Sequence, residues 1–592
     1  MLTKRNSVIP VIGFSASALS FFVFCCALAS SELAAAASKA TVIVTNAHVY
    51  TVYAKQPWAQ ALAISDDTIL AVGSNKAIDS FRDKNTHVID AHGKLVLPGF
   101  TDSHIHFLEG SRLLTQVDLN GTSSIAEVQK RVKEYAAAHP HAGWILGRGW
   151  SYDIFGEAAL PDKKYLDEVV SDRPVYLVGF DGHTSWINSK ALEVSGITRD
   201  TPNPPAGWIV KDAKGEPTGA LKEDADDIVG NQVHATHDEQ MTSLRLGLRE
   251  ANRVGLVRVH CLGNEQEVVS DMQNIALFDE LRRAGELTVR MYIASYAGPP
   301  SFSAEQIAAV QKAKQQYHDE WISAGAVKFY LDGVIESHTA AMLTPYSDDP
   351  TQIGKLRWDE DRYKQAVAAL DKIGIQVFTH AIGDRAVRLA LDAYEQAAKA
   401  NGTHDMRNRI EHIETITAQD IPRFGKLGVI ASYQPLHAEP NDDTLKVWAR
   451  NAGPDRASRG WTWQSVARSG GRMAFGSDWP VVTLNPWYGI QNAVTRQTLD
   501  GKPEGGWIPA ERVSLEQAIE GYTLGAAFSG HREKSEGSLE KGKLADLIML
   551  DQDLFKIAPG DIHKTIVLLT MVGGRIVYQT PEMAGSMKGN SK

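Results

Sequence analysis

The amino-acid sequence predicts an α/β protein: a (β/α)8 TIM barrel with a large insertion after strand 1, plus a small composite β-sandwich domain built from both chain ends. Eight apolar, strand-like runs alternate with charged helical stretches through the middle of the chain, as parallel βα units do. Far more residues separate the first run from the second than one connecting helix needs. Both ends of the chain carry short β-type runs of their own.

Length and composition set the domain count and exclude one class of partner. A chain of 592 residues is too long for one simple core, so we expect at least two domains. A formal charge of −10 is mild for this length and argues against nucleic-acid binding. The expected domains are a signal peptide (1–38), the β-sandwich (40–97 and 536–582) and the barrel (98–535). The insertion, about 108–240, is expected to cover the barrel mouth.

The N-terminus has the order of an export signal. Lys4 and Arg5 precede a mostly apolar run over 8–28, and the alanine-rich stretch ELAAAASKA follows. This order is typical of a cleaved secretory signal, so we expect an exported protein, periplasmic or secreted. An uncleaved membrane anchor is the alternative, because the run is nearly long enough to span a bilayer.

Cysteine usage agrees with a chain that has no internal disulfide after cleavage. Cys25 and Cys26 would leave with the signal, and Cys261 alone would remain. After removal of the signal we expect no stable membrane association.

Short strand-like runs joined by turn residues mark both ends of the remaining chain. ATVIVTNAHVYTV and ALAISDDTILAVGS lie near the N-terminus, and LADLIMLDQDL and IVLLTMVGGRIVYQT near the C-terminus. They predict one sandwich assembled from both ends, although separate hairpins would give the same pattern.

The eight barrel runs are identified by apolar, β-branched composition and by the helical stretches between several of them, such as YKQAVAALDKI. In chain order they are GFTDSHIHF (99–107), LVRVHCLG (256–263), LTVRMYIASY (287–296), AVKFYLDG (326–333), IQVFTHAIG (375–383), RNRIEHIE (407–414), GVIASYQP (428–435) and RMAFGSD (472–478).

Five of these runs carry potential metal ligands at or near their ends. His104 and His106 are two residues apart in a strand, so both imidazoles point to one side. The carboxyl ends of all the strands lie at the same face of a barrel, so the ligands would come together in one place. Each residue alone has a structural explanation, such as a paired lysine, but the set indicates a divalent-metal centre. The set is His104, His106, Lys328, His380, His412 and Asp478.

At this point the sequence resembles a metal-dependent amidohydrolase of the superfamily that includes dihydroorotase, urease and phosphotriesterase. Within it, the motifs resemble the amidohydrolase-3 group, which includes N-substituted formamide deformylases. The similarity covers essentially the whole chain after the signal. The motifs that carry it are PGFTDSHIHF, VKFYLDG, FTHAIGDRA, RIEHIE, FGSDWPV, GHTSWINSKAL and GKLADLIMLD.

The resemblance implies a binuclear centre, most typically with two zinc ions. The ligands would be His104, His106 and Asp478 at the more buried metal, His380 and His412 at the more exposed metal, and Lys328 between them as an N6-carboxylated bridge. An ammonium group cannot bind a cation, whereas a lysine carbamate offers two oxygens. An unmodified Lys328 would favour a single metal.

The implied activity is hydrolysis of a carbon–nitrogen, amide-type bond in a small molecule. Hydroxide activated by the metals would attack the carbonyl, and Asp478 would carry the proton to the leaving nitrogen. Phosphotriester or lactone and ester hydrolysis uses the same metal logic and stays open as an alternative. A non-catalytic metal- or ligand-binding relic is a third reading. All six ligand positions are filled, however, including Asp478, which an inert binder would have less reason to retain.

Four residues are candidate substrate contacts. His183 in GFDGHTSWINS would donate a hydrogen bond to the developing oxyanion or to substrate, or would simply fix the inserted loop. Trp150, Trp186 and Trp479 would wall the pocket, although tryptophans often only pack.

Cleavage of the N-terminal segment is testable without knowing the substrate. We expect protein recovered from its native envelope to lack roughly the first 30–40 residues, because the charged, apolar and small-residue regions follow in the order of a signal peptide. Intact-mass measurement checks this. A mass that still includes Met1 through Ala29 would show an anchor instead.

Overall fold

The computed structural model divides the chain into two compact units, residues 1–38 and 39–592. The structure describes residues 39–156, 160–179, 184–204, 207–223, 225–233, 235–263 and 271–584, without the side chains of 271–273. The predicted signal peptide lies outside these residues. No helix among them is long and apolar enough to cross a membrane.

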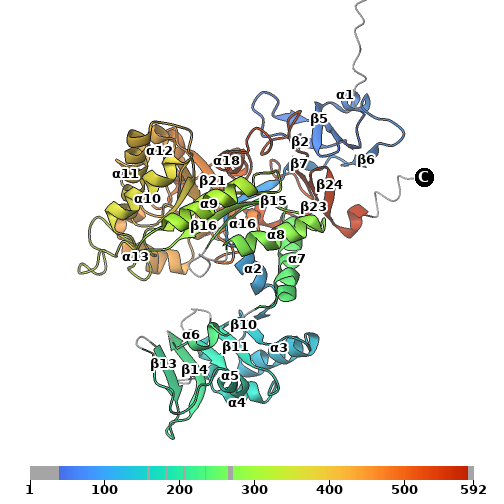
Figure 1. The fold of residues 1–592 in the computed structure, drawn as a ribbon. Coiled ribbons are helices and arrows are strands. Elements are labelled where there is room, and N and C mark those ends of the chain that lie inside the picture. Colours follow the sequence, from blue (N-terminus) through green and yellow to red (C-terminus); the bar gives the residue numbers. More distant parts are fainter. Residues whose placement is uncertain are drawn as a thin grey trace, which may run out of the picture. The chain divides into compact units, whose positions relative to one another are not determined.

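Eight parallel strands form the barrel sheet, and each predicted run overlaps one of them (Figure 1). The strand in the fourth run begins earlier than predicted, at Ile322. The burial patterns explain the composition of the runs, because most of these strands are buried at every position. In sheet order the strands are β21 (Arg472–Phe475), β20 (Ile430–Tyr433), β19 (Arg409–His412), β18 (Gln376–Ala381), β17 (Ile322–Tyr330), β16 (Arg290–Ala297), β15 (Leu256–Leu262) and β8 (Phe100–Ile105).

Hydrogen bonds beyond the last strand bring the two edges of this sheet together. The backbone N–H of Asp478, just after β21, donates to the carbonyl of His104 in β8 at 2.7 Å. The N–H of His106 donates to the carbonyl of Trp479 at 2.8 Å. The sheet is therefore a nearly closed barrel, and the fold-class prediction is confirmed.

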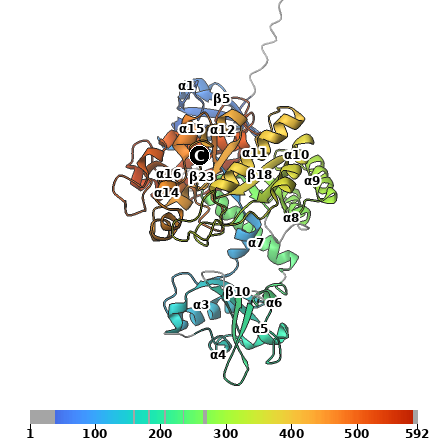
Figure 2. The same ribbon diagram turned by 90° about the vertical axis from the view of Figure 1, so that its left-hand side faces the viewer.

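Helices follow the strands and cover the outside of the sheet; Figures 1 and 2 show α9, α10 and α11 grouped beside the strands. Several begin with a side-chain cap that the sequence encodes. The Thr236 hydroxyl accepts from the N–H of Glu239, whose carboxylate accepts from the N–H of Thr236. The helices include α7 (His237–Arg253), α8 (Asp271–Arg283), α9 (Ala304–Gln316), α10 (Glu360–Lys372), α11 (Asp384–Asn401), α12 (Ile421–Leu427), α15 (Trp463–Arg468), α16 (Pro486–Thr495), α17 (Leu515–Gly521) and α18 (Leu524–Ser529).

Two further sheets use strands from the chain ends. A four-stranded sheet has the order β5 (Thr68–Gly73), β4 (Ala61–Ser65), β1 (Val42–Thr45) and β6 (His87–Asp90). A six-stranded sheet has the order β24 (Arg575–Gln579), β23 (Val567–Val572), β22 (Leu547–Leu550), β7 (Leu95–Pro98), β2 (His48–Tyr50) and β3 (Trp58–Ala59). One hydrophobic cluster joins buried residues of both sheets. The exact domain boundaries stay a prediction.

The N- and C-terminal segments meet at β7, which pairs in antiparallel register with β22. Two buried ion pairs also join the barrel strands to the C-terminal segment. Arg258 of β15 binds both carboxylate oxygens of Glu536 at 2.6 and 2.7 Å, and Arg290 of β16 binds Asp546 at 2.8 and 3.0 Å. In both pairs the guanidinium and the carboxylate share two hydrogen bonds in a fork geometry, which favours a buried ion pair.

The segment between β8 and β15 contains an α/β unit with its own sheet and cores. In sheet order its strands are β13 (Gly207–Lys211), β14 (Pro217–Glu223), β12 (Thr184–Ile187), β11 (Val175–Gly179), β10 (Ile145–Trp150) and β9 (Val117–Asp118). Its longest helix is α3 (Ile125–Ala138). The predicted insertion is thus a folded unit; its role as a cover of the barrel mouth stays a prediction.

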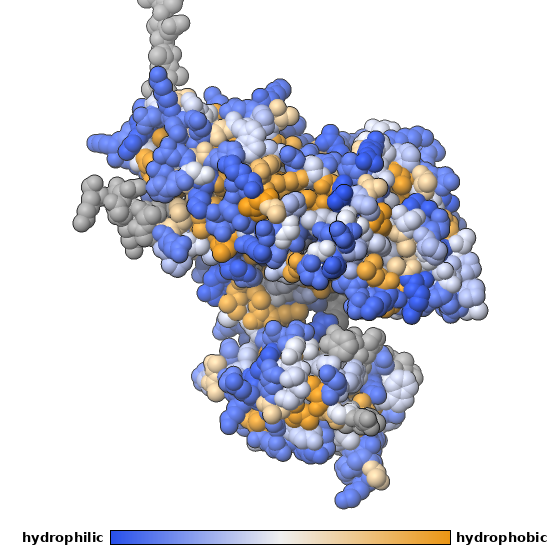
Figure 3. All heavy atoms as spheres, turned by 180° about the vertical axis from the view of Figure 1, so that it is seen from behind, coloured by the Kyte–Doolittle hydropathy of each residue, from blue (hydrophilic) through white to orange (hydrophobic). Residues whose placement is uncertain are grey.

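Hydrophilic side chains predominate on the face shown in Figure 3, and apolar side chains are scattered among them. Such a mainly hydrophilic surface is expected when most large apolar side chains are buried in the internal cores.

Candidate functional site

The structure brings all six predicted ligand residues together at the carboxyl ends of the barrel strands. Five of them are buried, and His106 is half-buried. They come from or directly follow five strands: His104 and His106 from β8, Lys328 from β17, His380 from β18, His412 from β19 and Asp478 from the segment after β21.

The ligating atoms converge on Asp478. Its Oδ1 lies 3.3 Å from His104 Nε2 and 3.2 Å from His106 Nε2. The His412 ring lies 4.9 Å from the His104 ring and 4.5 Å from the His380 ring, between centroids. One ligating atom from each of His104, His412 and Asp478 fits within 4.8 Å of the others. These atoms are close enough to share one small ion.

Lys328 lies beside the same group of residues. Its Nζ is 3.3 Å from His104 Nε2 and 4.7 Å from the centre of the Tyr330 ring. Burial lowers the pKa of Lys328 to about 8. The amine is therefore much easier to deprotonate than an exposed lysine.

The backbone around the ligands is locally constrained. His412, Ile413 and Asp478 have φ values of +73°, +50° and +63°, in a region that non-glycine residues rarely adopt. Gly476 precedes Asp478, and a Cβ there would lie 2.5 Å from the backbone nitrogen of His104. Only glycine lets the segment after β21 approach β8 this closely. Such strain is concentrated at functional sites.

Asp102 holds the two edges of the barrel together below the ligands. Its Oδ1 accepts from the N–H groups of His104 and Ser477, both at 3.0 Å. Burial raises the pKa of Asp102 to about 7, although these hydrogen bonds oppose the shift. The carboxyl group thus positions both the first histidine and the loop that carries Asp478.

The electrostatics suit a cation. Burial lowers the pKa of His380 to about 3, and the nearby Lys328 charge adds to the shift. Burial also holds the pKa of His412 well below its usual value. Burial by itself would raise the pKa of Asp478, but His104 and His106 hold it well below its usual range. Neutral imidazoles and an ionised carboxylate are the protonation states that metal ligands need.

The donor set therefore fits a divalent cation. His412 Nδ1 and Asp478 Oδ1 are buried and have no hydrogen-bond partner among the described residues. Unpaired buried polar atoms are costly, and a shared ion would satisfy them. Three or more imidazoles with one carboxylate are typical ligands of zinc and similar metals.

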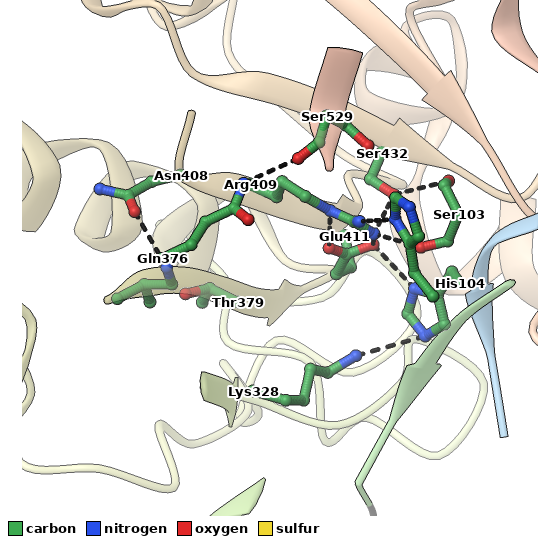
Figure 4. A network of polar contacts seen from close by, with 12 residues as sticks. Ser103, His104, Lys328, Gln376, Thr379, Asn408, Arg409, Glu411, Ser432 and Ser529 are labelled. Carbon is green, nitrogen blue, oxygen red and sulfur yellow. Dashed lines mark hydrogen bonds and ion pairs between the residues drawn. The ribbon is translucent and has the colours of Figure 1, made fainter. Parts of the chain in front are cut away.

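A polar network that the sequence analysis did not identify lies behind His104 (Figure 4). His104 Nδ1 lies 2.8 Å from Glu411 Oε2, and both Glu411 oxygens accept from Arg409 at 2.8 and 3.0 Å. Burial would raise the pKa of Glu411, but Arg409 and His104 lower it far below its usual range. The alternation in RNRIEHIE contained the signal, because Arg409 and Glu411 share one face of their strand.

Two more residues beside the ligands were also missed. His437, after β20, has its ring parallel to that of His412 and its Nε2 3.8 Å from Asp478 Oδ2. Asp332, after β17, accepts from three backbone N–H groups and lies 3.5 Å from His380 Nε2. Burial raises the pKa of Asp332 to about 7. Nothing in the spacing of either residue predicted a place in the site.

The proposed substrate contacts have different surroundings. Trp150 and Trp186 are completely buried in a core of the insertion, where their Nε1 groups donate to the carbonyls of Leu177 and Asp162. Trp479 packs against Phe107 and fills the space beside Gly110. These are packing contacts, so substrate contact through any of the three stays a prediction. His183 lies outside the described residues.

The lowered pKa of His380 makes a prediction about acid stability. In the folded, metal-free protein His380 stays neutral until about pH 3, whereas in the unfolded chain it binds a proton below about pH 6.5. Its contribution to stability is therefore complete above pH 6.5 and is lost as the pH falls. Lowering the pH from 7.5 to 5 should reduce the free energy of unfolding of the parent protein. We expect this reduction to be about 2 kcal/mol smaller in His380→Gln.

Chemical denaturation of chelator-treated protein at the two pH values measures this difference. The control is His87→Gln, since His87 is exposed on an outer strand. An unchanged pH dependence in His380→Gln would contradict the assignment of a buried neutral ring.

Comparison with known proteins agrees with this fold and shows the family of the chain. A family model described as "Amidohydrolase family" matches residues 87–578. The chain is 34% identical over 541 residues to Protein LONG AFTER FAR-RED 3 of Arabidopsis thaliana, covering 91% of this chain and 92% of the relative. It is 27% identical over 545 residues to N-substituted formamide deformylase of Arthrobacter pascens, covering 91% and 98%.

Among solved structures, the fold is similar to an uncharacterized metal-dependent hydrolase from Pyrococcus horikoshii. The TM-score is 0.72 at 24% identity, with 88% of this chain and 99% of that chain covered. With the family model covering most of the chain, the resemblance inferred from the motifs is confirmed. The chain belongs to the amidohydrolase family of metal-dependent hydrolases.

Proposed function

We propose that this hydrolase cleaves a carbon–nitrogen, amide-type bond in a small molecule, with Asp478 as the proton shuttle. The observation that carries the proposal is the convergence of His104, His412 and Asp478 within 4.8 Å at the carboxyl end of the barrel. Active sites of such barrels lie at this end. The similarity to N-substituted formamide deformylase, which is named for an amide-type substrate, supports the bond class.

The residues that would hold the metal are the six predicted ligands: His104, His106, Lys328, His380, His412 and Asp478. A bound divalent cation lowers the pKa of a water molecule and polarises a carbonyl oxygen. We propose two zinc ions as the complement of this six-residue set.

We propose that Asp478 moves a proton, and its surroundings support this role. Its Oδ1 faces His104 and His106, while its Oδ2 faces His437 at 3.8 Å. As the attacking water forms a bond to the carbonyl carbon, Asp478 accepts a proton from that water. It then donates the proton to the leaving nitrogen, and the C–N bond breaks to give a carboxylic acid and a neutral amine. Without protonation the nitrogen would have to leave as an amide anion.

Lys328 is suited to carboxylation. At a pKa of about 8, about a tenth of the amine is neutral at pH 7, and only the neutral amine attacks carbon dioxide. The nitrogen forms a bond to carbon and releases a proton, which gives a carbamate with two oxygens. These oxygens supply the bridge that an ammonium group cannot. Lys328 Nζ lies 3.3 Å from His104 Nε2, and this closeness to a proposed ligand supports the bridging role.

Metal content tests the role of Lys328. We expect about two divalent ions per chain after gentle dialysis, and one or none in Lys328→Ala, because the bridge between the two positions is lost. Elemental analysis measures the stoichiometry. The control is Lys133→Ala, which removes an exposed lysine from α3. If Lys328→Ala kept the parental metal content, the bridging role would be wrong.

The Asp478→Asn variant separates metal binding from proton transfer. Asparagine keeps the shape and one oxygen ligand but loses the base, so amide hydrolysis should fall by about 10²–10⁴. Hydrolysis of activated aryl esters should fall less, because their leaving groups need no proton. Metal analysis and kinetics on matched anilides and p-nitrophenyl esters measure both effects.

Asp442→Asn is the control, since this carboxylate is 81% exposed. Equal and small losses for amides and esters in Asp478→Asn would show that Asp478 is a ligand and does not shuttle protons.

A further inference from the structure

The network behind His104 contains an ion pair at an unusually costly position. The side chains of Arg409 and Glu411 are completely buried inside the barrel, and both come from β19. Removing two charges from water costs several kcal/mol per ion, and apolar replacements of buried ion pairs are often neutral or stabilising. Stability alone is therefore a poor reason for an ion pair here.

The described side-chain contacts of Arg409 join several strands around the first histidine. Its Nη2 donates to the carbonyl of Ser103 and, at 3.0 Å, to Ser432 Oγ. Its Nη1 lies 2.9 Å from His260 Nδ1, and its guanidinium lies 3.9 Å from the centre of the Phe378 ring. Ser103 directly precedes His104, so one guanidinium fixes both the backbone before His104 and the carboxylate beside its ring (Figure 4).

These contacts determine where the protons lie. Arginine has no acceptor atom, so His260 Nδ1 must accept from Arg409, which makes His260 a neutral ring with its proton on Nε2. That Nε2 is buried against Gly530, where a Cβ would lie 2.8 Å away. The same logic applies at the other end of the network. The Glu411 carboxylate is only an acceptor, so His104 Nδ1 must donate to it.

A His104 ring that donates from Nδ1 and is neutral has its free lone pair on Nε2. This is the atom that faces Asp478 Oδ1 and Lys328 Nζ, both at 3.3 Å. A ring in the other tautomer would present an N–H to the same place and could not bind a metal. The tautomer is therefore decisive for metal binding.

We infer that Arg409, Glu411 and His260 form a positioning unit that holds His104 in its metal-binding tautomer and orientation. This inference rests on the proposed metal-dependent function. It assigns Glu411 as the positioning residue in contact with His104, Arg409 as the group that orients Glu411, and His260 as the acceptor that orients Arg409. None of the three belongs to the proposed ligand set.

The barrel supplies a matched control for this inference. Arg258 and Glu536 form a second buried arginine–glutamate pair, bonded at 2.6 and 2.7 Å with side chains 0% and 3% exposed. This pair joins β15 to the C-terminal segment and makes no contact with a proposed ligand among its described hydrogen bonds. Breaking either pair leaves one buried arginine without its carboxylate. Only one of the two changes should alter metal binding.

The experiment compares Glu411→Gln with Glu536→Gln in the full chain. Zinc affinity is measured by competition with a chromogenic chelator, and the melting temperature of each metal-free protein is recorded in parallel. We expect both variants to melt below the parent. We expect Glu411→Gln to bind zinc about 10–100-fold more weakly, the usual effect of losing a partner of a histidine ligand. Glu536→Gln should bind zinc with the parental affinity.

A milder variant keeps the test decisive if Glu411→Gln does not fold. Glu411→Asp retains the charge for Arg409 but withdraws the carboxylate from His104 by one methylene, so zinc affinity should fall by an intermediate factor. Parental zinc affinity in the Glu411 variants, or an equal loss in Glu536→Gln, would overturn the inference while leaving the proposed function intact. A parent protein that binds no zinc would instead overturn the proposed function, and the inference with it.

Discussion

The hydrogen bonds between β8 and the segment after β21 are the constraint on which both fold and site depend. They join the first and last strands of the barrel, and they do so at His104 and Asp478 themselves. Asp102 adds a carboxylate bridge between the same two segments. Gly476 permits the approach because it has no Cβ. Closing the barrel and assembling the ligand set are thus one event, and a side chain at position 476 would disturb both.

The site combines groups that are expensive to bury, and their protonation states follow from that burial. Low polarity keeps His380 and His412 neutral, while Asp478 stays ionised because histidines surround it. The result is a set of imidazole lone pairs beside one ionised carboxylate, and these are donor atoms that a divalent cation can bind. The strained backbone at His412, Ile413 and Asp478 is part of the same arrangement. It gives these side chains directions that regular strand geometry would not give them.

The sequence was sufficient for the barrel strands and for the common location of the six residues predicted to be ligands; their binding of a metal stays a prediction. Apolar runs predict buried parallel strands well, and the carboxyl ends of such strands meet at one face of the barrel. Glu411 and His437 were missed because their partners lie far away in sequence, and only the closed barrel brings them close. Trp150 and Trp186 illustrate the opposite difficulty. Their composition suits a pocket wall and a core equally well, and the structure places both in a core.

The pairing of β7 with β22 has a consequence for biosynthesis. β7 acquires one neighbour, β2, early in the chain, but its other edge has no partner until β22 emerges near the end of translation. At about 5–20 residues per second, that edge waits on the order of tens of seconds. An unpaired apolar strand edge is a template for association with other chains. The N-terminal strands therefore need protection throughout synthesis of the barrel, by a chaperone or by delayed folding, before the final sheet can close.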